Sequence, residues 1–345
     1  MQTLNRRGFM LGALPSDSEN DSDKLKNWRL GKPILLKQAC LNLMDVHTDN
    51  IQATESFVLA VLEGEECEAL LDNPPYSDRL KGSFESMGAA LNEGDDQEIE
   101  AVMFDAKSND MLVAEDLWMK VSWLSFFDED ASIRFRFSFG VDLEEDVSAD
   151  PIRQRAAAEL AETIFPESSL ITRNEALIDN ICSASGIENP EFVERILYFN
   201  APHGGAYFHH DLERGHAGVV YCQVSGSTYW LALPHAELAQ EISFFVLHKP
   251  LPTSLSDEQK AELQQLAQSE HSISKALNTF ANDALIHLIN ETQEFRQYLS
   301  NNGHGRLLNK GDAILLPQGD TATCCWHTVF CVGDEVGQAL SFAIT

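Results

Sequence analysis

One short polar motif limits how this chain can fold. His209 and Asp211 lie two residues apart, just after the glycine-rich segment 202–206. On an extended backbone, residues two apart point to the same side, so both side chains can bind one ion while His210 faces the other way. His327, flanked by short apolar runs that predict strands, can supply a third ligand. The three meet only if the β-sheet closes on itself, as in barrels and jelly rolls.

The chemistry of these side chains favours a metal centre. Two imidazoles and one carboxylate leave coordination positions open, which is the ligand set of non-haem Fe(II) oxygenases. We therefore interpret His209, Asp211 and His327 as metal ligands and as the catalytic centre. In the alternative interpretation, His209 and Asp211 only hydrogen-bond each other at a strand end and His327 is a core histidine. His304 and His216 are the alternatives for the third ligand.

The cysteines do not form a recognisable metal or disulfide pattern. There are seven, an odd number, with no C-x-x-C pair. This usage argues against a zinc ribbon or a disulfide framework and favours a reducing cytoplasm. Cys324 and Cys325 are adjacent, so they point to opposite strand faces and are interpreted as buried small hydrophobes. His203 and His210 are expected to support the site or to cap turns.

Composition excludes some partners. The formal net charge is -30, with 54 acidic against 24 basic residues among 345. Binding a nucleic-acid backbone needs clustered Lys and Arg, so no nucleic-acid partner is expected, whereas a basic protein partner is compatible. The segment 5–11 looks like a twin-arginine export signal, but its apolar stretch breaks at Pro15. No apolar run approaches the ~20 residues of a membrane span, so no membrane partner is expected.

Changes in pattern divide the chain. The predicted parts are a flexible acidic tail at 1–27, an N-terminal flanking part at 28–191, a barrel core at about 192–234 and 306–345, and a helical insert at about 235–305. Strands are predicted at 33–39, 101–104, 133–139, 192–200, 219–224, 228–233, 311–317 and 339–344, and helices at 63–71 and 152–165. The segment 225–227 predicts a hairpin between two of these strands. Alternation in 133–139 puts Arg134 and Arg136 on one face, which either looks into a site or is solvated or paired with acids.

The insert has a helical pattern. Ser256 and Gln259 have the spacing of a capping box. A single helix face is predicted to carry Leu277, Phe280, Ala284 and Leu288. The insert is expected either to close as a lid over a small substrate or to form a homodimer.

Several segments, in their order, resemble the JmjC branch of the cupin-fold Fe(II) and 2-oxoglutarate oxygenases, and most closely its bacterial ribosomal-protein hydroxylases. The matching segments are 31–37, 202–206, His209-His210-Asp211, 223–226 with Trp230 and Pro234, and 311–317 through His327. The resemblance implies an α+β fold: a double-stranded β-helix (cupin or jelly-roll) core with flanking helices and a helical insert, forming one domain over 28–345.

The resemblance also implies an activity. His209, Asp211 and His327 would bind Fe(II), with 2-oxoglutarate as co-substrate. The chain would then hydroxylate an aliphatic carbon of a protein or peptide side chain, or of a small amino-acid-like substrate. The alternatives are a cupin metalloenzyme that does not use 2-oxoglutarate and a non-catalytic cupin-fold binding protein.

The sequence departs from this family at the co-substrate site. Family members usually have Lys or Arg two residues after the turn glycine, to pair with the far carboxylate of 2-oxoglutarate, and here that position is Thr228. Another cation must compensate if 2-oxoglutarate binds. The candidates are Arg214, Arg195, Arg136, Arg134, Arg306 and Lys310. We expect Thr228, Arg214, Tyr221 and Tyr207 to contact the cofactor, although Tyr207, Tyr221 and Trp230 alternatively only fill the barrel.

Overall fold

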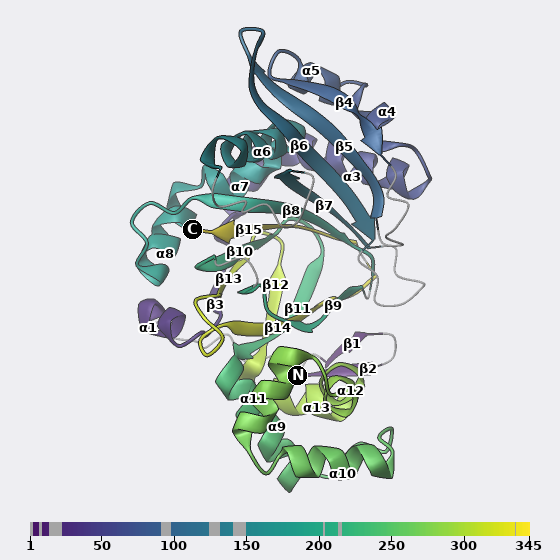
Figure 1. Ribbon diagram of the computed structural model, residues 1–345, viewed down its shortest axis with the longest axis vertical. Helices are drawn as coiled ribbons and strands as arrows, with labels where there is room; N and C mark the ends of the chain where they lie inside the picture. Colours follow the sequence, from purple (N-terminus) through teal and green to yellow (C-terminus); the bar gives the residue numbers. More distant parts are fainter. Residues whose placement is uncertain are drawn as a thin grey trace.

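The computed structural model describes residues 3–6, 9–13, 23–90, 98–123, 132–140, 150–202, 204–212, 216–334 and 336–345. Two β-sheets face each other at the centre of the molecule (Figure 1). Helices of the N-terminal half pack on the outside of the larger sheet, and the helices of the insert pack on the outside of the smaller one. The space between the sheets is therefore shielded from both sides.

Eight strands form the barrel. They are β8 (Phe192–Asn200), β9 (Gly205–His209), β10 (Gly218–Gln223), β11 (Ser227–Pro234), β12 (Gly305–Asn309), β13 (Ala313–Pro317), β14 (Cys325–Cys331) and β15 (Gly337–Ile344). The larger sheet contains the order β13-β10-β15-β8 and the smaller sheet has the order β12-β11-β14-β9, with antiparallel pairing. The chain passes repeatedly between the two sheets, which is the winding of a jelly roll. The predicted fold, an α+β chain with a double-stranded β-helix core, flanking helices and a helical insert, is confirmed.

The turn at 225–227 differs from the predicted hairpin. β10 pairs with β13 and β15, whereas β11 pairs with β12 and β14, so the two strands joined by this turn belong to opposite sheets. Gly226 has a φ of +63°, and a Cβ there would lie 2.6 Å from the carbonyl oxygen of Val336. Glycine is required because the turn carries the chain across the barrel against neighbouring backbone.

The larger sheet continues beyond the barrel on both edges. After β8 follow β7 (Ile133–Phe139), β6 (Met111–Trp123), β5 (Glu98–Ser108) and β4 (Phe84–Ala90), and β3 (Ile34–Leu36) pairs with β13. Phe135 packs edge-on against Phe57 of α3 (Thr48–Leu62) and against Phe165, with ring centroids 5.8 and 5.5 Å apart. The alternation predicted for this strand therefore directs its aromatic side chains to the core and its arginines to the opposite face.

Short helices complete the N-terminal half. They are α1 (Lys24–Arg29), α2 (Leu41–Met44), η1 (Asp45–His47), α4 (Cys67–Leu71), α5 (Tyr76–Leu80), α6 (Pro151–Ile164), η3 (Pro166–Ser168), α7 (Ser169–Thr172) and α8 (Glu175–Ser185). The helix predicted at 63–71 begins only at Cys67, because α3 ends at Leu62 and Gly64 adopts a φ of +94°. Within the segment expected to be a tail, β1 (Thr3–Arg6) pairs with β2 (Phe9–Ala13). Regular structure thus begins earlier than predicted.

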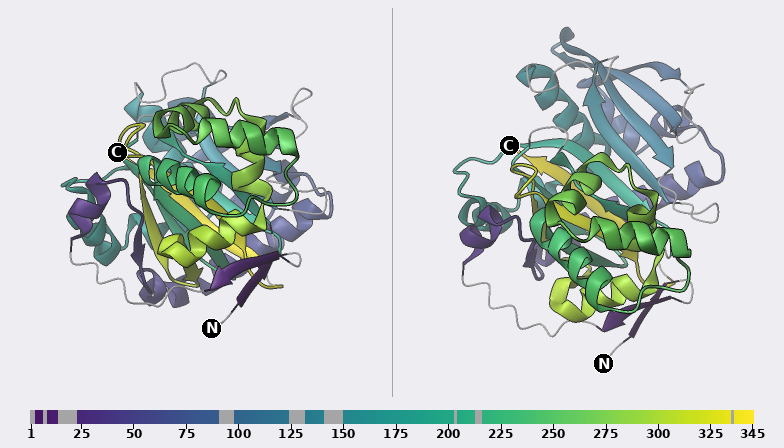
Figure 2. Two further views of the ribbon diagram at one scale, coloured as in Figure 1. Left: turned by 90° about the horizontal axis from the view of Figure 1, so that it is seen from below. Right: turned by 60° about the horizontal axis from the view of Figure 1, so that its bottom comes forward.

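Five α-helices and one π-helix lie between β11 and β12. They are α9 (His235–His248), α10 (Asp257–Leu266), α11 (Glu270–Thr279), α12 (Asp283–Glu291), α13 (Gln293–Leu299) and η5 (Ser300–His304). Figure 2 shows them grouped on one side of the barrel. Their apolar side chains form one cluster with Phe208, Tyr229 and Leu231 of the smaller sheet. The predicted capping box at Ser256 and Gln259 is present.

The continuous helix face predicted at 277–288 is wrong. α11 ends at Thr279, and Phe280 adopts a left-handed conformation with a φ of +47° before α12 begins. Phe280 is 47% exposed, whereas Leu277, Ala284 and Leu288 are buried as expected. The apolar spacing therefore arises from two consecutive helices that cover the same sheet. In the described part of the chain, no helix combines the length and the apolar composition needed to cross a bilayer.

Candidate metal centre

Three predicted ligands meet at one end of the smaller sheet. His209 is the last residue of β9 and pairs directly with His327 of β14. Asp211 follows β9 by two residues, and its carboxylate oxygens lie 3.7 Å from His209 Nε2 and 3.6 Å from His327 Nε2. The ligand atoms of the three residues all lie within 4.8 Å of one another. A single ion can therefore contact all three, as the alternation of side chains predicted.

Both imidazoles are oriented by their own strands. His209 Nδ1 lies 2.6 Å from the carbonyl oxygen of Tyr207, and His327 Nδ1 lies 3.2 Å from that of Cys325. A carbonyl only accepts hydrogen bonds, so each Nδ1 carries a proton, and in the neutral ring the lone pair lies on Nε2, the atom that faces Asp211. Burial, with a smaller effect of His209, lowers the pKa of His327 to about 4. His327 is thus a neutral imidazole, the form that binds metals.

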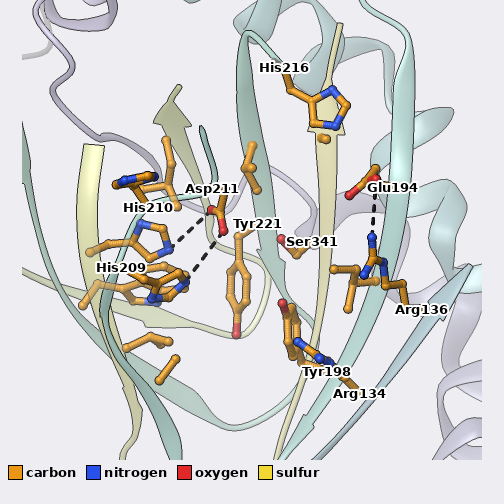
Figure 3. A pocket seen from close by; sticks show the side chains of 18 of the residues that line it. Arg134, Arg136, Glu194, Tyr198, His209, His210, Asp211, His216, Tyr221 and Ser341 are labelled. Carbon is orange, nitrogen blue, oxygen red and sulfur yellow. Dashed lines mark ion pairs between the residues drawn. The ribbon is translucent and has the colours of Figure 1, made fainter. Parts of the chain in front are cut away.

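The ligands line a cavity of about 470 Å³ between the two sheets. Figure 3 shows His209 and Asp211 on one side of the space and, across it, Arg134, Arg136 and Tyr198 of the larger sheet. The lining residues include polar groups from both sheets: Arg134, Arg136, Glu194, Tyr198, Tyr207, His209, His210, Asp211, His216, Tyr221, Ser341 and His327. Within the described chain, no residue of α9 to α13 lines this cavity, and the lid considered from the sequence stays a prediction.

Aromatic rings form the floor of the cavity. The ring of Trp230 lies 5.5 Å from that of His327, and the ring of Tyr221 lies 4.7 Å from that of Trp230. Tyr198, on β8, continues this row at 6.4 Å from Tyr221. Tyr221 and Trp230 therefore line the pocket as well as fill the barrel.

Thr228 lies beneath this floor and outside the cavity lining. It is buried, its hydroxyl donates to Gln223 Oε1 at 2.7 Å, and it accepts a hydrogen bond from Trp230 Nε1 at 2.9 Å. The hydroxyl proton of Thr228 is therefore already donated to Gln223. Of the other residues expected to contact the cofactor, Tyr207 lines the cavity but donates its hydroxyl proton to Glu291, and Arg214 lies outside the described residues.

Among the candidate cations that the structure describes, Arg134 and Arg136 of β7 face the cavity. Arg134 Nε donates to Ser122 Oγ at 2.9 Å, and Arg136 lies 3.6 Å from Glu194. Arg195 points to the opposite face of β8, where it pairs with Glu162 at 2.6 Å. Arg306 and Lys310 do not line the cavity.

The remaining alternatives for the metal site have other surroundings. His304 pairs with Glu241 of α9 at 3.0 Å, within the insert. His216 lines the cavity but is not part of the group of converging ligand atoms. Cys324 and Cys325 are buried, and burial raises the pKa of the Cys324 thiol to about 11, so the interpretation as small hydrophobes holds. His203 lies outside the described residues.

Several cavity residues were not singled out from the sequence, and Tyr198 is among them. Tyr198 lines the cavity, and its hydroxyl makes no hydrogen bond within the described chain. Burial, together with Asp211, raises the pKa of Tyr198 to about 12, against the opposing effect of Arg134. It is therefore a neutral phenol that can donate a hydrogen bond into the cavity. The signal in the sequence was its parity with Glu194 and Ile196 on a predicted strand, which places all three on one face.

Fold and site together define a double-stranded β-helix protein in which two histidines and one carboxylate form a group that could hold a metal ion. No protein-family model matches the sequence, and no curated protein matches it. Solved structures to which the chain is similar include a 2OG-Fe(II) oxygenase family oxidoreductase from Burkholderia pseudomallei, at 9% identity over 67% of this chain and 68% of that one, with a TM-score of 0.27.

They also include the ribosomal oxygenase YcfD from Escherichia coli in complex with cobalt and succinic acid, at 9% identity and a TM-score of 0.30. That match covers 95% of this chain and 52% of the other, so the chain spans about half the length of YcfD. OsALKBH1 is matched at 10% identity over 91% of this chain and 97% of that one, with a TM-score of 0.29.

Proposed function

We propose that this protein is an Fe(II)- and 2-oxoglutarate-dependent dioxygenase that hydroxylates an aliphatic carbon. The observation that carries the proposal is the convergence of two imidazole Nε2 atoms and one carboxylate on the wall of a cavity between two sheets. Two imidazoles and one carboxylate would hold an ion and leave other coordination positions open to ligands.

The residues present fit Fe(II). His209, Asp211 and His327 would hold it, and the carbonyl contacts of both Nδ1 atoms keep the two Nε2 atoms available without a proton to displace. When bound, Fe(II) with 2-oxoglutarate and O2 supplies the oxidation of a C–H bond to an alcohol, with 2-oxoglutarate converted to succinate and CO2.

The chain's own residues confine this chemistry. His327 is 3% exposed, and the rings of Trp230 and Tyr221 pack beside it, so these side chains limit the access of water to His327. The cavity volume of about 470 Å³ exceeds the space that a five-carbon acid fills. The remaining space fits the side chain of a protein or peptide, or a small amino-acid-like molecule, as the carbon that is hydroxylated. Dimerisation through the insert and a cytoplasmic location stay predictions.

The test is turnover of 2-oxoglutarate to succinate by the purified chain. We expect it to require Fe(II) and to fall at least about 100-fold in His209→Ala and Asp211→Ala, because both remove a ligand. His271→Ala, at an exposed position of α11, is the control that should leave turnover unchanged. Iron-loaded protein that neither binds nor consumes 2-oxoglutarate would rule the proposal out.

A second function is favoured by Thr228. Since the β11 position that faces the co-substrate in the family has no cation, a cupin metalloenzyme that does not use 2-oxoglutarate is the alternative. Oxygen uptake in the absence of 2-oxoglutarate, abolished in Asp211→Ala, would favour this second activity. Purified protein without stoichiometric metal would instead favour a non-catalytic binding protein.

A further inference from the structure

The cavity wall opposite the metal ligands carries an arginine and a phenol that face the same space. Arg134 of β7 pairs directly with Tyr198 of β8, and residues opposite each other on neighbouring strands point to the same face. Both line the cavity, and Figure 3 shows them close together on the side away from Asp211. β7 lies one strand outside the barrel wall, about 5 Å further out, a gap that the long arginine side chain covers.

The two arginines of β7 differ in their partners. Arg136 lies 3.6 Å from Glu194 and over the ring of Trp118 at 5.8 Å, so its charge is matched locally. Arg134 contacts a neutral group, Ser122 Oγ, through Nε. Within the described ranges, the other nitrogens of Arg134 form no ion pair. Arg134 therefore brings an unmatched positive charge to the cavity.

The charges that line the cavity match a dianion. Glu194 is matched by Arg136, and Asp211 would neutralise one of the two charges of a divalent metal. One positive charge then remains at the metal and one at Arg134. The keto-acid end of 2-oxoglutarate carries one negative charge to the metal, and its remote carboxylate carries the second one across the cavity.

β11 has Thr228 at the position where the family has a cation, and Thr228 does not replace that cation. Thr228 on β11 is 0% exposed, and its hydrogen bonds to Gln223 and Trp230 lie under the aromatic floor. Tyr198, in contrast, lines the cavity in the row of rings that begins at His327, and its hydroxyl has no hydrogen-bond partner among the residues that the structure describes.

We propose that Arg134, assisted by the hydroxyl of Tyr198, binds the carboxylate of 2-oxoglutarate that is remote from the metal. The larger sheet thus supplies, from β7, the cation that β11 lacks. This inference rests on the proposed function, because it concerns the co-substrate of the same site.

The test compares two keto acids on protein loaded with Mn(II), which supports binding without turnover. 2-Oxopentanoate has the same length as 2-oxoglutarate but no remote carboxylate. By isothermal titration calorimetry we expect the intact protein to prefer 2-oxoglutarate by about tenfold or more, as a charge-assisted contact gives. Arg134→Gln should lose about tenfold in affinity for 2-oxoglutarate and keep its affinity for 2-oxopentanoate.

Two further variants complete the design. Arg134→Lys should retain part of the preference, because it keeps the charge but loses the fork of donors. Arg136→Gln is the matched control: it removes a guanidinium from the same strand and face, and it should change the preference less than Arg134→Gln does. Unchanged binding of 2-oxopentanoate and of Mn(II) shows that each variant is folded.

The outcomes separate the two proposals. If the intact Mn(II) protein binds neither keto acid, the proposed function fails. If it prefers 2-oxoglutarate and Arg134→Gln keeps that preference, the function stands and the assignment to Arg134 is overturned. A larger loss in Arg136→Gln than in Arg134→Gln also overturns it.

Discussion

At the scale of single residues, the two histidine ligands are held in the same way. Each Nδ1 faces the carbonyl oxygen of the residue two positions earlier on its own strand, Tyr207 for His209 and Cys325 for His327. The rings are thus fixed by local backbone, and their centroids lie 4.3 Å apart. The ligand geometry is therefore set by the strands themselves, before any ion binds.

Thr228 is expected to act on stability rather than on co-substrate binding. In Thr228→Val the shape is kept, but Trp230 Nε1 loses its acceptor and Gln223 Oε1 loses a donor, both in the buried floor. We expect a loss of about 1–3 kcal/mol in the free energy of unfolding. Chemical denaturation measures it, and Thr228→Ser, which keeps the hydroxyl, is the control. A large drop in 2-oxoglutarate affinity at unchanged stability would contradict this prediction.

The residues that could be predicted are those whose role follows from local spacing. His209 and Asp211 share a face because they are two apart, and His327 is flanked by strand-forming residues. Arg134 and Arg136 were placed on one face, but the sequence could not show what that face looks toward. Tyr198 was missed for the same reason, because its place in the cavity depends on the pairing of β8 with β7 and β15.

At the scale of elements, β9 depends on the insert. Its strand neighbour is β14 alone, and on its other edge Phe208 N donates to Asn290 Oδ1 of α12 at 2.8 Å. Asn290 is 4% exposed. The strand that carries His209 is thus held between another strand and a helix of the insert, although the insert does not reach the cavity.

Removing the hydrogen bond between Phe208 and Asn290 should weaken metal binding, although Asn290 is not itself a ligand. In Asn290→Ala the buried N–H of Phe208 loses its partner, which costs about 1–3 kcal/mol. We expect Mn(II) affinity to fall by about tenfold, and calorimetric titration measures it. Asn282→Ala, which removes the N-cap of the same helix without touching β9, should cost about 1 kcal/mol and leave metal affinity unchanged. Equal affinities in both variants would contradict the role of Asn290.

An ion pair between Glu162 of α6 and Arg195 of β8 joins these two elements, and its contribution to stability should depend on pH. Burial tends to raise the pKa of Glu162, but Arg195, Thr172 and Arg173 outweigh it and hold this pKa below its ordinary 4.5. A carboxyl group with a lowered folded pKa stabilises the fold above its unfolded pKa, and this contribution is lost as the pH falls through the folded pKa.

Glu162→Gln should therefore destabilise the protein by about 2 kcal/mol near neutral pH, because Arg195 loses its counter-charge. The difference between the two proteins should shrink as the pH falls below 4.5, where the carboxyl group of the unfolded chain becomes protonated. Urea denaturation at both pH values measures the difference. A difference that does not change with pH would argue against the ion pair.

The elements themselves were predicted unevenly. β7 and β8 occur at the predicted residues, because strong alternation or a long apolar run identifies a strand. The hairpin at 225–227 was wrong because a turn sequence does not say whether its two strands pair with each other. Phe280 interrupts a helical pattern that Leu277 and Ala284 continue, since two helices cover one sheet.

At the scale of the whole molecule, the predicted closure of the sheet is what brings His209 and His327 together, since β9 and β14 are distant in the chain but paired in space. The formal charge of -30 gave no information about the cavity, where Arg134 faces inward. The net charge is a sum over all residues of the chain, so it could not reveal a single arginine side chain in the cavity.

Metal binding should stabilise the whole fold, because the ligands come from β9 and β14 and the unfolded chain does not hold them together. At a free Mn(II) concentration of about 100 times Kd, the expected gain is about 2.7 kcal/mol. Thermal melting should show a rise in Tm with Mn(II) that a chelator reverses, and a further rise with 2-oxoglutarate only when metal is present. Asp211→Ala should show neither rise, and equal shifts in this variant would contradict the site.

The strand order also has a consequence for synthesis on the ribosome. In the larger sheet β10 lies between β13 and β15, and in the smaller sheet β9 pairs with β14, so β9 and β10 can pair only with strands that are translated after them. A nascent chain that has just completed the insert has His209 and Asp211 but no His327. If the proposed metal centre is correct, the three ligands can hold an ion together only after β14 has been synthesised and has paired with β9.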